Sequence, residues 1–175
     1  MQQQVESAET PVTTRSVGIK YGLISTLVAI LFFLVLVFSG QNAFENKWGW
    51  VRVIISVVFV VLAHKDFKDS GDGFMSYGQG VGIAFWISLV GTVLGTLFTY
   101  VYVTLIDPGV MDSFYIMQTE QFEAQGMPDS QIETTITWTK KLFWPMGIFV
   151  GLLFGVLVGV FVSIFTQKKN PEPTF

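Results

Sequence analysis

The chain has 175 residues, of which 51% are hydrophobic and 13% are charged, and its formal net charge at pH 7 is −3. Soluble chains carry about 25% charged residues, so this composition excludes a disordered chain and argues strongly against an ordinary soluble domain. The absence of cysteine excludes disulfides, thiolate catalysis and thiolate metal ligation. The lack of a long basic run argues against nucleic-acid binding. The composition therefore predicts an integral membrane protein of one domain.

Four apolar stretches are candidates for membrane-spanning helices, which need about 20 apolar residues. They cover residues 17–38, 48–63, 77–106 and 142–166. The second is short and has Arg52 in its first turn, from which the guanidinium can reach the membrane surface. Continuous apolar runs favour helices over barrel strands, which alternate and span about 10 residues. The predicted fold is an all-α, four-helix transmembrane bundle.

Two polar tails and one long loop account for most of the remaining chain. We expect residues 1–16 to be a disordered tail, residues 17–166 to be the membrane domain and residues 167–175 to be a second tail. The loop over residues 107–141 is acidic. Its charged residues are Asp107, Asp112, Glu120, Glu123, Asp129 and Glu133 against Lys140 and Lys141.

This acidic loop is expected to be helical. Apolar residues at helical spacing predict a helix over residues 111–124. Ser130 and Glu133 have the spacing of a capping box, in which each side chain bonds the backbone N–H of the other residue, so a second helix should begin there. That helix can continue into the fourth span, where Pro145 should kink it near the membrane surface.

The distribution of bases predicts the orientation of the chain. Four spans place both termini on one side, together with Arg15, Lys20, Lys65, Lys68, Lys168 and Lys169. The other side has Lys47, Arg52, Lys140 and Lys141. Because basic residues favour the cytoplasmic side, we expect a multi-pass protein of the inner membrane with both termini in the cytoplasm and an extracytoplasmic acidic loop.

Glycines recur at a spacing of four residues in the last two spans. They are Gly147, Gly151, Gly155 and Gly159 in the fourth span, and Gly78, Gly82, Gly91 and Gly95 in the third. Each four-residue step turns a helix by about 400°, so such a row lines one slowly winding face. Helices in lipid associate where small residues let their backbones approach closely. The pattern predicts a tight helix contact, either within the chain or between subunits.

Hydroxyl side chains share one face of the third span, at Ser88, Thr92, Thr96 and Thr99. Such hydroxyls usually bond to a neighbouring helix or to a carbonyl one turn back. A polar lining for a solute path is the alternative interpretation.

No ionisable side chain lies deep in a predicted span, so proton-coupled transport loses its main support. His64, the only histidine, is expected at the membrane interface, with a pH sensor or metal ligand as the alternative. Asp66, Asp69 and Asp72 are expected to be solvated loop acids, since the calcium-loop signature is absent. Without a catalytic motif, we predict no enzymatic activity, no cofactor and no metal.

Three motifs resemble a known family. They are SYGQG at residues 76–80, YVTLIDPG at residues 102–109 and QGMPDSQIE at residues 125–133. Together they resemble the domain-of-unknown-function family numbered 4199, known mostly from Bacteroidota, over roughly residues 18–165. The resemblance implies a small four-span inner-membrane protein and carries no activity or functional residues.

These features predict a structural or accessory subunit that packs through glycine-rich helix faces. Its partners would be membrane lipid and either a second copy or a membrane complex, and its acidic loop could dock a basic partner. The alternative is an oligomeric channel or carrier for a small neutral solute, lined by the hydroxyls of the third span.

Overall fold

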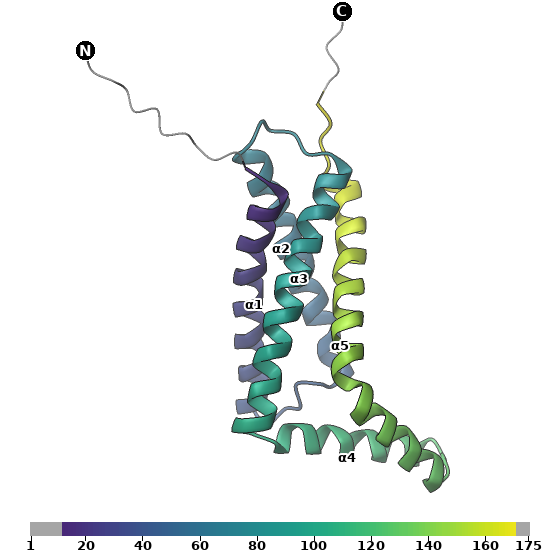
Figure 1. Ribbon diagram of the computed structural model, residues 1–175. Helices are drawn as coiled ribbons and strands as arrows, with labels where there is room; N and C mark the ends of the chain where they lie inside the picture. Colours follow the sequence, from purple (N-terminus) through teal and green to yellow (C-terminus); the bar gives the residue numbers. More distant parts are fainter. Residues whose placement is uncertain (1–11, 171–175) are drawn as a thin grey trace, which may run out of the picture.

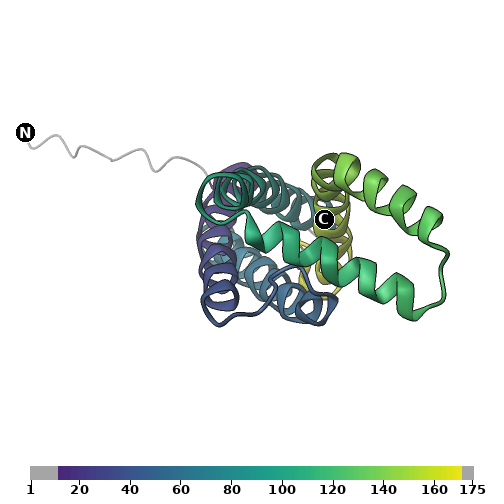
Figure 2. The ribbon, with the colours of Figure 1, turned by 90° about the horizontal axis from the view of Figure 1, so that it is seen from below.

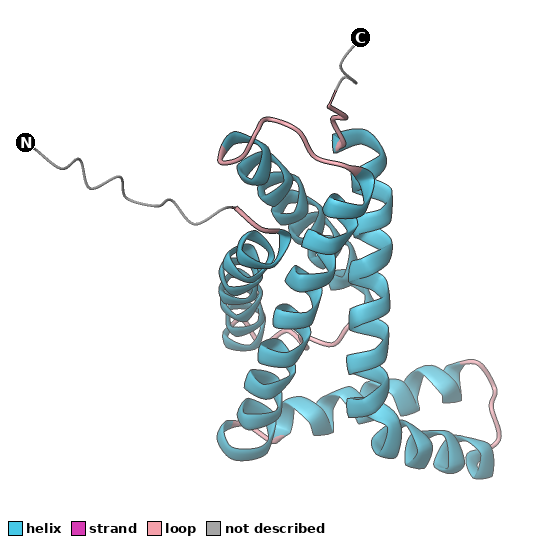
Figure 3. Ribbon diagram, turned by 45° about the horizontal axis from the view of Figure 1, so that its top comes forward, coloured by secondary structure: helices cyan, strands magenta, loops and turns pink. Residues whose placement is uncertain are grey.

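The computed structural model describes residues 12–170, which form helices joined by short loops (Figure 3). The elements are α1 (Thr14–Phe38), the short 3₁₀ helix η1 (Asn46–Trp48), α2 (Gly49–Asp69), α3 (Tyr77–Val101), the π-helical η2 (Tyr102–Ile106), α4 (Gly109–Ala124) and α5 (Asp129–Thr166). Within these residues there is no strand, only an isolated bridge between Met75 and Lys168. The all-helical class predicted from the sequence is confirmed.

Four helices, α1, α2, α3 and α5, lie side by side as a bundle (Figure 1). The amino end of α1 and the carboxyl end of α5 lie at the same end of this bundle. At the opposite end α4 runs across the bundle. Figure 2 shows that α4 and the amino-terminal part of α5 project sideways beyond the other helices. We call this projection the arm, defined as residues 109–141.

Three helical segments are long and apolar enough to cross a membrane: Thr14–Phe38, Tyr77–Ile106 and Asp129–Thr166. They agree with an integral membrane protein. The expected second span differs, because α2 has Arg52 near its start and Lys65 and Asp66 near its end. The uncharged run between them is shorter than the roughly 20 residues that a span needs. α2 is nevertheless packed against α1, α3 and α5.

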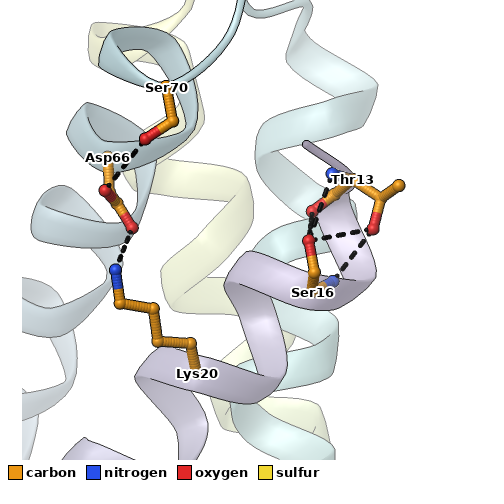
Figure 4. A network of polar contacts seen from close by, with 5 residues as sticks. All are labelled: Thr13, Ser16, Lys20, Asp66 and Ser70. Carbon is orange, nitrogen blue, oxygen red and sulfur yellow. Dashed lines mark hydrogen bonds and ion pairs between the residues drawn. The ribbon is translucent and has the colours of Figure 1, made fainter. Parts of the chain in front are cut away.

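Helix α1 begins earlier than expected, at Thr14 rather than at residue 17. Thr13 and Ser16 form a capping box: Ser16 N donates to Thr13 Oγ1 at 3.0 Å, and Thr13 N donates to Ser16 Oγ at 3.1 Å (Figure 4). These bonds satisfy two backbone donors that the first turn would otherwise leave open. Residues 14–16 therefore belong to the helix, and residues 1–11 of the expected tail lie outside the described residues.

Helix α2 continues to Asp69, six residues beyond its expected end. Contacts with other helices hold these extra turns. Lys20 Nζ of α1 lies 2.8 Å from Asp66 Oδ2, as Figure 4 shows, and Lys68 Nζ donates to the Thr166 carbonyl of α5 at 2.9 Å.

Helix α5 runs unbroken from the arm into the bundle, with Pro145 inside it, and Figure 1 shows it changing direction. The capping box expected at Ser130 and Glu133 is wrong. Pro128 takes the cap position with an extended backbone, and no side chain caps the helix there. At its other end, Lys168 exchanges two backbone hydrogen bonds with Met75, of 2.9 and 2.8 Å. Residues 171–175 of the second expected tail lie outside the described residues.

Two hydrophobic clusters occupy the two ends of the bundle. The first joins α1, α2, α3 and α5 near the described chain ends and includes Val60, Ile83 and Val158. The second lies toward α4 and is centred on Tyr102 and Val103, with phenylalanines packed against it.

Candidate functional site

Helices α3 and α5 approach closely at two glycines of the predicted row. A Cβ atom added at Gly155 would overlap the side chain of Ser88, and one added at Gly159 would overlap that of Ala84. Neither position has room for a larger residue without a shift of the backbone. We call these two contacts the α3–α5 seam, and both lie within the chain.

The other glycines of the predicted rows have more room. A Cβ at Gly151 would lie 3.1 Å from Thr92 Oγ1, and one at Gly147 would meet no atom within 4 Å. On α3, added Cβ atoms would meet ordinary contacts or none within 4 Å at Gly78, Gly82, Gly91 and Gly95. The four-residue spacing therefore marks a close contact at some of these positions only.

Sequence reasoning missed a second close contact, between α1 and α3. A Cβ at Gly18 would overlap Trp86, and one at Gly22 would lie 2.8 Å from Val90 Cβ. These two glycines have the same four-residue spacing as the predicted rows, so the signal was present in the sequence. A single pair of glycines is a weaker signal than a row of four, because glycine is common in membrane helices.

A cavity of about 380 Å³ lies between α1, α2, α3 and α5. Its aromatic lining comes from Phe32, Phe33, Phe44, Phe98 and Phe154. Its hydroxyl lining comes from Ser25, Thr26, Ser56, Ser88, Thr92 and Thr99. Three of the four residues predicted as a polar face of α3 thus line this cavity, whereas Thr96 does not.

Several of these hydroxyls are bonded to their own helices. Thr26 Oγ1 donates to the Gly22 carbonyl at 2.6 Å, Ser25 Oγ donates to the same carbonyl at 3.0 Å, and Ser88 Oγ donates to the Ala84 carbonyl at 2.7 Å. Each of these bonds runs to a carbonyl about one turn back, which is a role expected from the sequence for hydroxyls in a membrane helix. The cavity wall is therefore less polar than its residue names suggest.

Arg52 is the one charged residue among the described residues that line the cavity. It is exposed, and its Nη2 donates to the carbonyl of Ala43. The ion pairs within 4 Å that the described residues form are Lys20–Asp66 and Lys47–Glu45, so no described carboxylate pairs with this guanidinium.

His64 is fully buried among the helices, and its expected depth at the membrane interface stays a prediction. Its Nε2 lies 2.9 Å from the Gly80 carbonyl, and its Nδ1 lies 2.7 Å from Thr166 Oγ1. Because a carbonyl only accepts, Nε2 carries the proton and donates to Gly80. The imidazole therefore links α2 to the start of α3 and the end of α5.

The arm carries most of the exposed acidic charge of the long loop. Exposed carboxylates lie at Asp112, Glu120, Glu123, Asp129 and Glu133, and none forms an ion pair within 4 Å with a described residue. Phe114 of α4 packs against Phe143 of α5, with ring centroids 5.7 Å apart, and holds the two helices of the arm together.

Tyr115 and Lys140 also join the helices of the arm, with the ammonium 5.0 Å from the ring centroid. Burial raises the pKa of Tyr115 above its ordinary value, with a smaller contribution from Asp112, so the phenol is neutral at pH 7. The base of the arm is fixed to the first loop, where Asn42 Nδ2 donates to Ser113 Oγ at 2.9 Å.

Within residues 12–170, no three His, Asp or Glu side chains are grouped closely enough to hold a metal ion. A family model described as "Protein of unknown function (DUF4199)" matches residues 20–168, which confirms the resemblance seen in the sequence. No curated protein and no solved structure matches the chain.

Proposed function

The chain belongs to the DUF4199 family, whose description assigns no function, and from its geometry we propose that it is a non-catalytic accessory subunit of a membrane complex. In this proposal α1, α2, α3 and α5 span the bacterial inner membrane. Six bases near the described chain ends, against four at the other end, favour a cytoplasmic position for the former, and in this proposal the arm then lies along the outer surface. The short α2 spans with the help of tilt, local thinning of the bilayer and its helical neighbours.

The acidic arm carries this proposal. It projects beyond the bundle, and its five exposed carboxylates have no described ion-pair partner. Charge complementarity steers association and suppresses wrong partners, so a surface of this kind suits a basic partner. Gly155 and Gly159 make their close contacts with α3 of the same chain, so the proposal does not rely on these two positions for assembly.

The first test is mild cross-linking in native membranes, followed by affinity purification and mass spectrometry with stoichiometry. We expect one recurrent partner with a basic surface at a fixed ratio. Recovery of the chain alone, as a monomer or a homo-oligomer, would contradict the proposal.

A charge reversal in the arm makes this test specific. Glu123→Lys should reduce recovery of the partner severalfold, because it places a repulsive charge in the contact. Glu123 lies in the last turn of α4, where a cation is favoured by the helix dipole, so the variant should remain folded. Asp69→Lys makes the same charge change at the opposite end of the bundle and should leave recovery unchanged. Equal recovery of the partner with both variants would show that the arm does not bind it.

A channel or carrier for a small solute is the second candidate, favoured by the cavity and its hydroxyls. The chain has no cysteine, so single cysteines can be introduced and labelled without background. Water-soluble reagents should label cysteine at Thr92 and Thr99, which line the cavity, better than at Thr96, which does not. Uniform inaccessibility of all three would remove this function.

A further inference from the structure

The cavity and Arg52 together form a site that neither the arm nor the seam explains. Five phenylalanines and one unpaired guanidinium face the same space of about 380 Å³. We propose that this cavity binds a single-chain anionic amphiphile, with its apolar chain among the phenylalanines and its carboxylate or phosphate on Arg52. This site goes beyond the accessory role, which rests on the arm.

The size of the cavity suits one chain. Ligand sites have volumes of about 300–1,000 Å³, and this cavity lies near the lower end of that range. It has room for one acyl chain and little room for a two-chain phospholipid. Apolar chains are stabilised by burial against aromatic and aliphatic side chains, which form most of the wall here.

Arg52 supplies the preference for an anion. A guanidinium has five N–H donors in a planar fork that matches a carboxylate or a phosphate, and the Ala43 carbonyl uses only part of this capacity. Arg52 also lies in the first turn of α2, where the helix dipole adds positive potential. The Arg52 side chain is exposed and pairs with no described carboxylate, so an anionic headgroup can reach it.

The hydroxyls of the wall do not require a polar solute. Ser25, Thr26 and Ser88 already donate to carbonyls of their own helices. A small neutral polar solute could bond to the remaining hydroxyls of Ser56, Thr92 and Thr99 but would leave Arg52 without a counter-ion. An anionic amphiphile uses both the charge and the apolar wall.

Photolabelling of the full chain, purified without partners in detergent, tests this site. The probe is a palmitate analogue with a diazirine in its chain, and labelled peptides are located by mass spectrometry. We expect labels on the cavity residues Phe98 and Phe154. Oleate should compete about tenfold or more better than oleyl alcohol, the effect of one charge-assisted hydrogen bond. Lysophosphatidic acid serves as the phosphate competitor, and its rank against oleate identifies the preferred headgroup.

Two variants and a control separate charge from volume. Arg52→Gln should lose the advantage of oleate over the alcohol, whereas Lys47→Gln, a nearby base paired with Glu45, should keep it. Ala29→Phe fills the cavity and should abolish labelling of Phe98 and Phe154 by the palmitate probe. Label confined to lipid-facing residues such as Leu97 and Phe161 would overturn the proposal. Equal competition by oleate and oleyl alcohol on the unmodified chain would also overturn it, even if the variants fail to fold.

Discussion

The two ends of the bundle differ in how closely their helices approach. Near the described chain ends, a Cβ at Gly159 would overlap Ala84, and one at Gly18 would overlap Trp86. Toward α4, a Cβ at Gly95 or Gly147 would meet no atom within 4 Å, and the cavity separates the helices. Glycines at the same four-residue spacing thus accompany contact at some positions and space at others, since a Cβ at Gly78, near the described chain ends, would also meet no atom within 4 Å. The spacing permits close approach, and the facing side chain decides whether it occurs.

A bulky residue in the α3–α5 seam should destabilise the protein most, because it removes the close approach of these two helices. Gly155→Leu should lower the free energy of unfolding by about 3 kcal/mol or more, because the added side chain overlaps Ser88 and forces the two helices apart. Loss of the folded monomer on heating in detergent, followed by size-exclusion chromatography, measures the change. Gly147→Leu on the same helix should lose no stability and should gain up to about 1 kcal/mol, because leucine favours the helix and the position is open. Similar losses for both variants would contradict the assignment of the seam.

Alanine substitutions at the two ends should have opposite signs. Gly159→Ala should destabilise the protein by about 1–3 kcal/mol, because its methyl group overlaps Ala84. Gly95→Ala should stabilise it by about 1 kcal/mol, because alanine favours the helix and the cavity has room for a methyl group. Thermal unfolding of the two variants under identical conditions gives both signs, and equal signs would show that the ends are packed alike.

The buried His64 joins three helices and should therefore stabilise the end of the bundle near the described chain ends. His64→Leu should cost about 1–3 kcal/mol, because it removes the hydrogen bonds to Gly80 and Thr166 at a site without water access. Thr166→Val removes one of the two partners. Because the two side chains are in contact, the double variant should lose less stability than the sum of the single losses. Strict additivity would show that His64 and Thr166 act independently.

The sequence predicts the features that depend on local patterns. Uncharged apolar runs identify α1, α3 and the bundle part of α5 as membrane helices, and regular apolar spacing finds α4. Features that depend on distant residues cannot be predicted from local sequence patterns. Asp66 contacts Lys20, 46 residues away, and His64 is buried against partners from α3 and α5.

Some features of the candidate site also follow from local sequence patterns, whereas others depend on distant residues. The glycine row and the hydroxyl face of α3 are visible as periodic patterns, yet their neighbours are not. The cavity is formed by four helices whose side chains leave space between them, and no local pattern encodes such a space. The misplaced capping box has a local cause, since Pro128 with its extended backbone takes the cap position ahead of Ser130. Proline two residues before a candidate cap is a signal that could have moved the expected start.

The ion pair at the tight end offers the smallest test of what holds the bundle together. Lys20 and Asp66 are in contact, but the side chain of Lys20 is 57% exposed, so solvent and salt screen the attraction. We expect Lys20→Gln to shift the unfolding temperature less than Gly155→Leu, Gly159→Ala or His64→Leu does, and high salt should remove the difference from the unmodified chain. A loss as large as that of Gly159→Ala would mean that this ion pair between α1 and α2 contributes as much to stability as the close contact between α3 and α5. Salt-insensitivity of such a loss would place the pair out of reach of solvent, contrary to the exposure of Lys20.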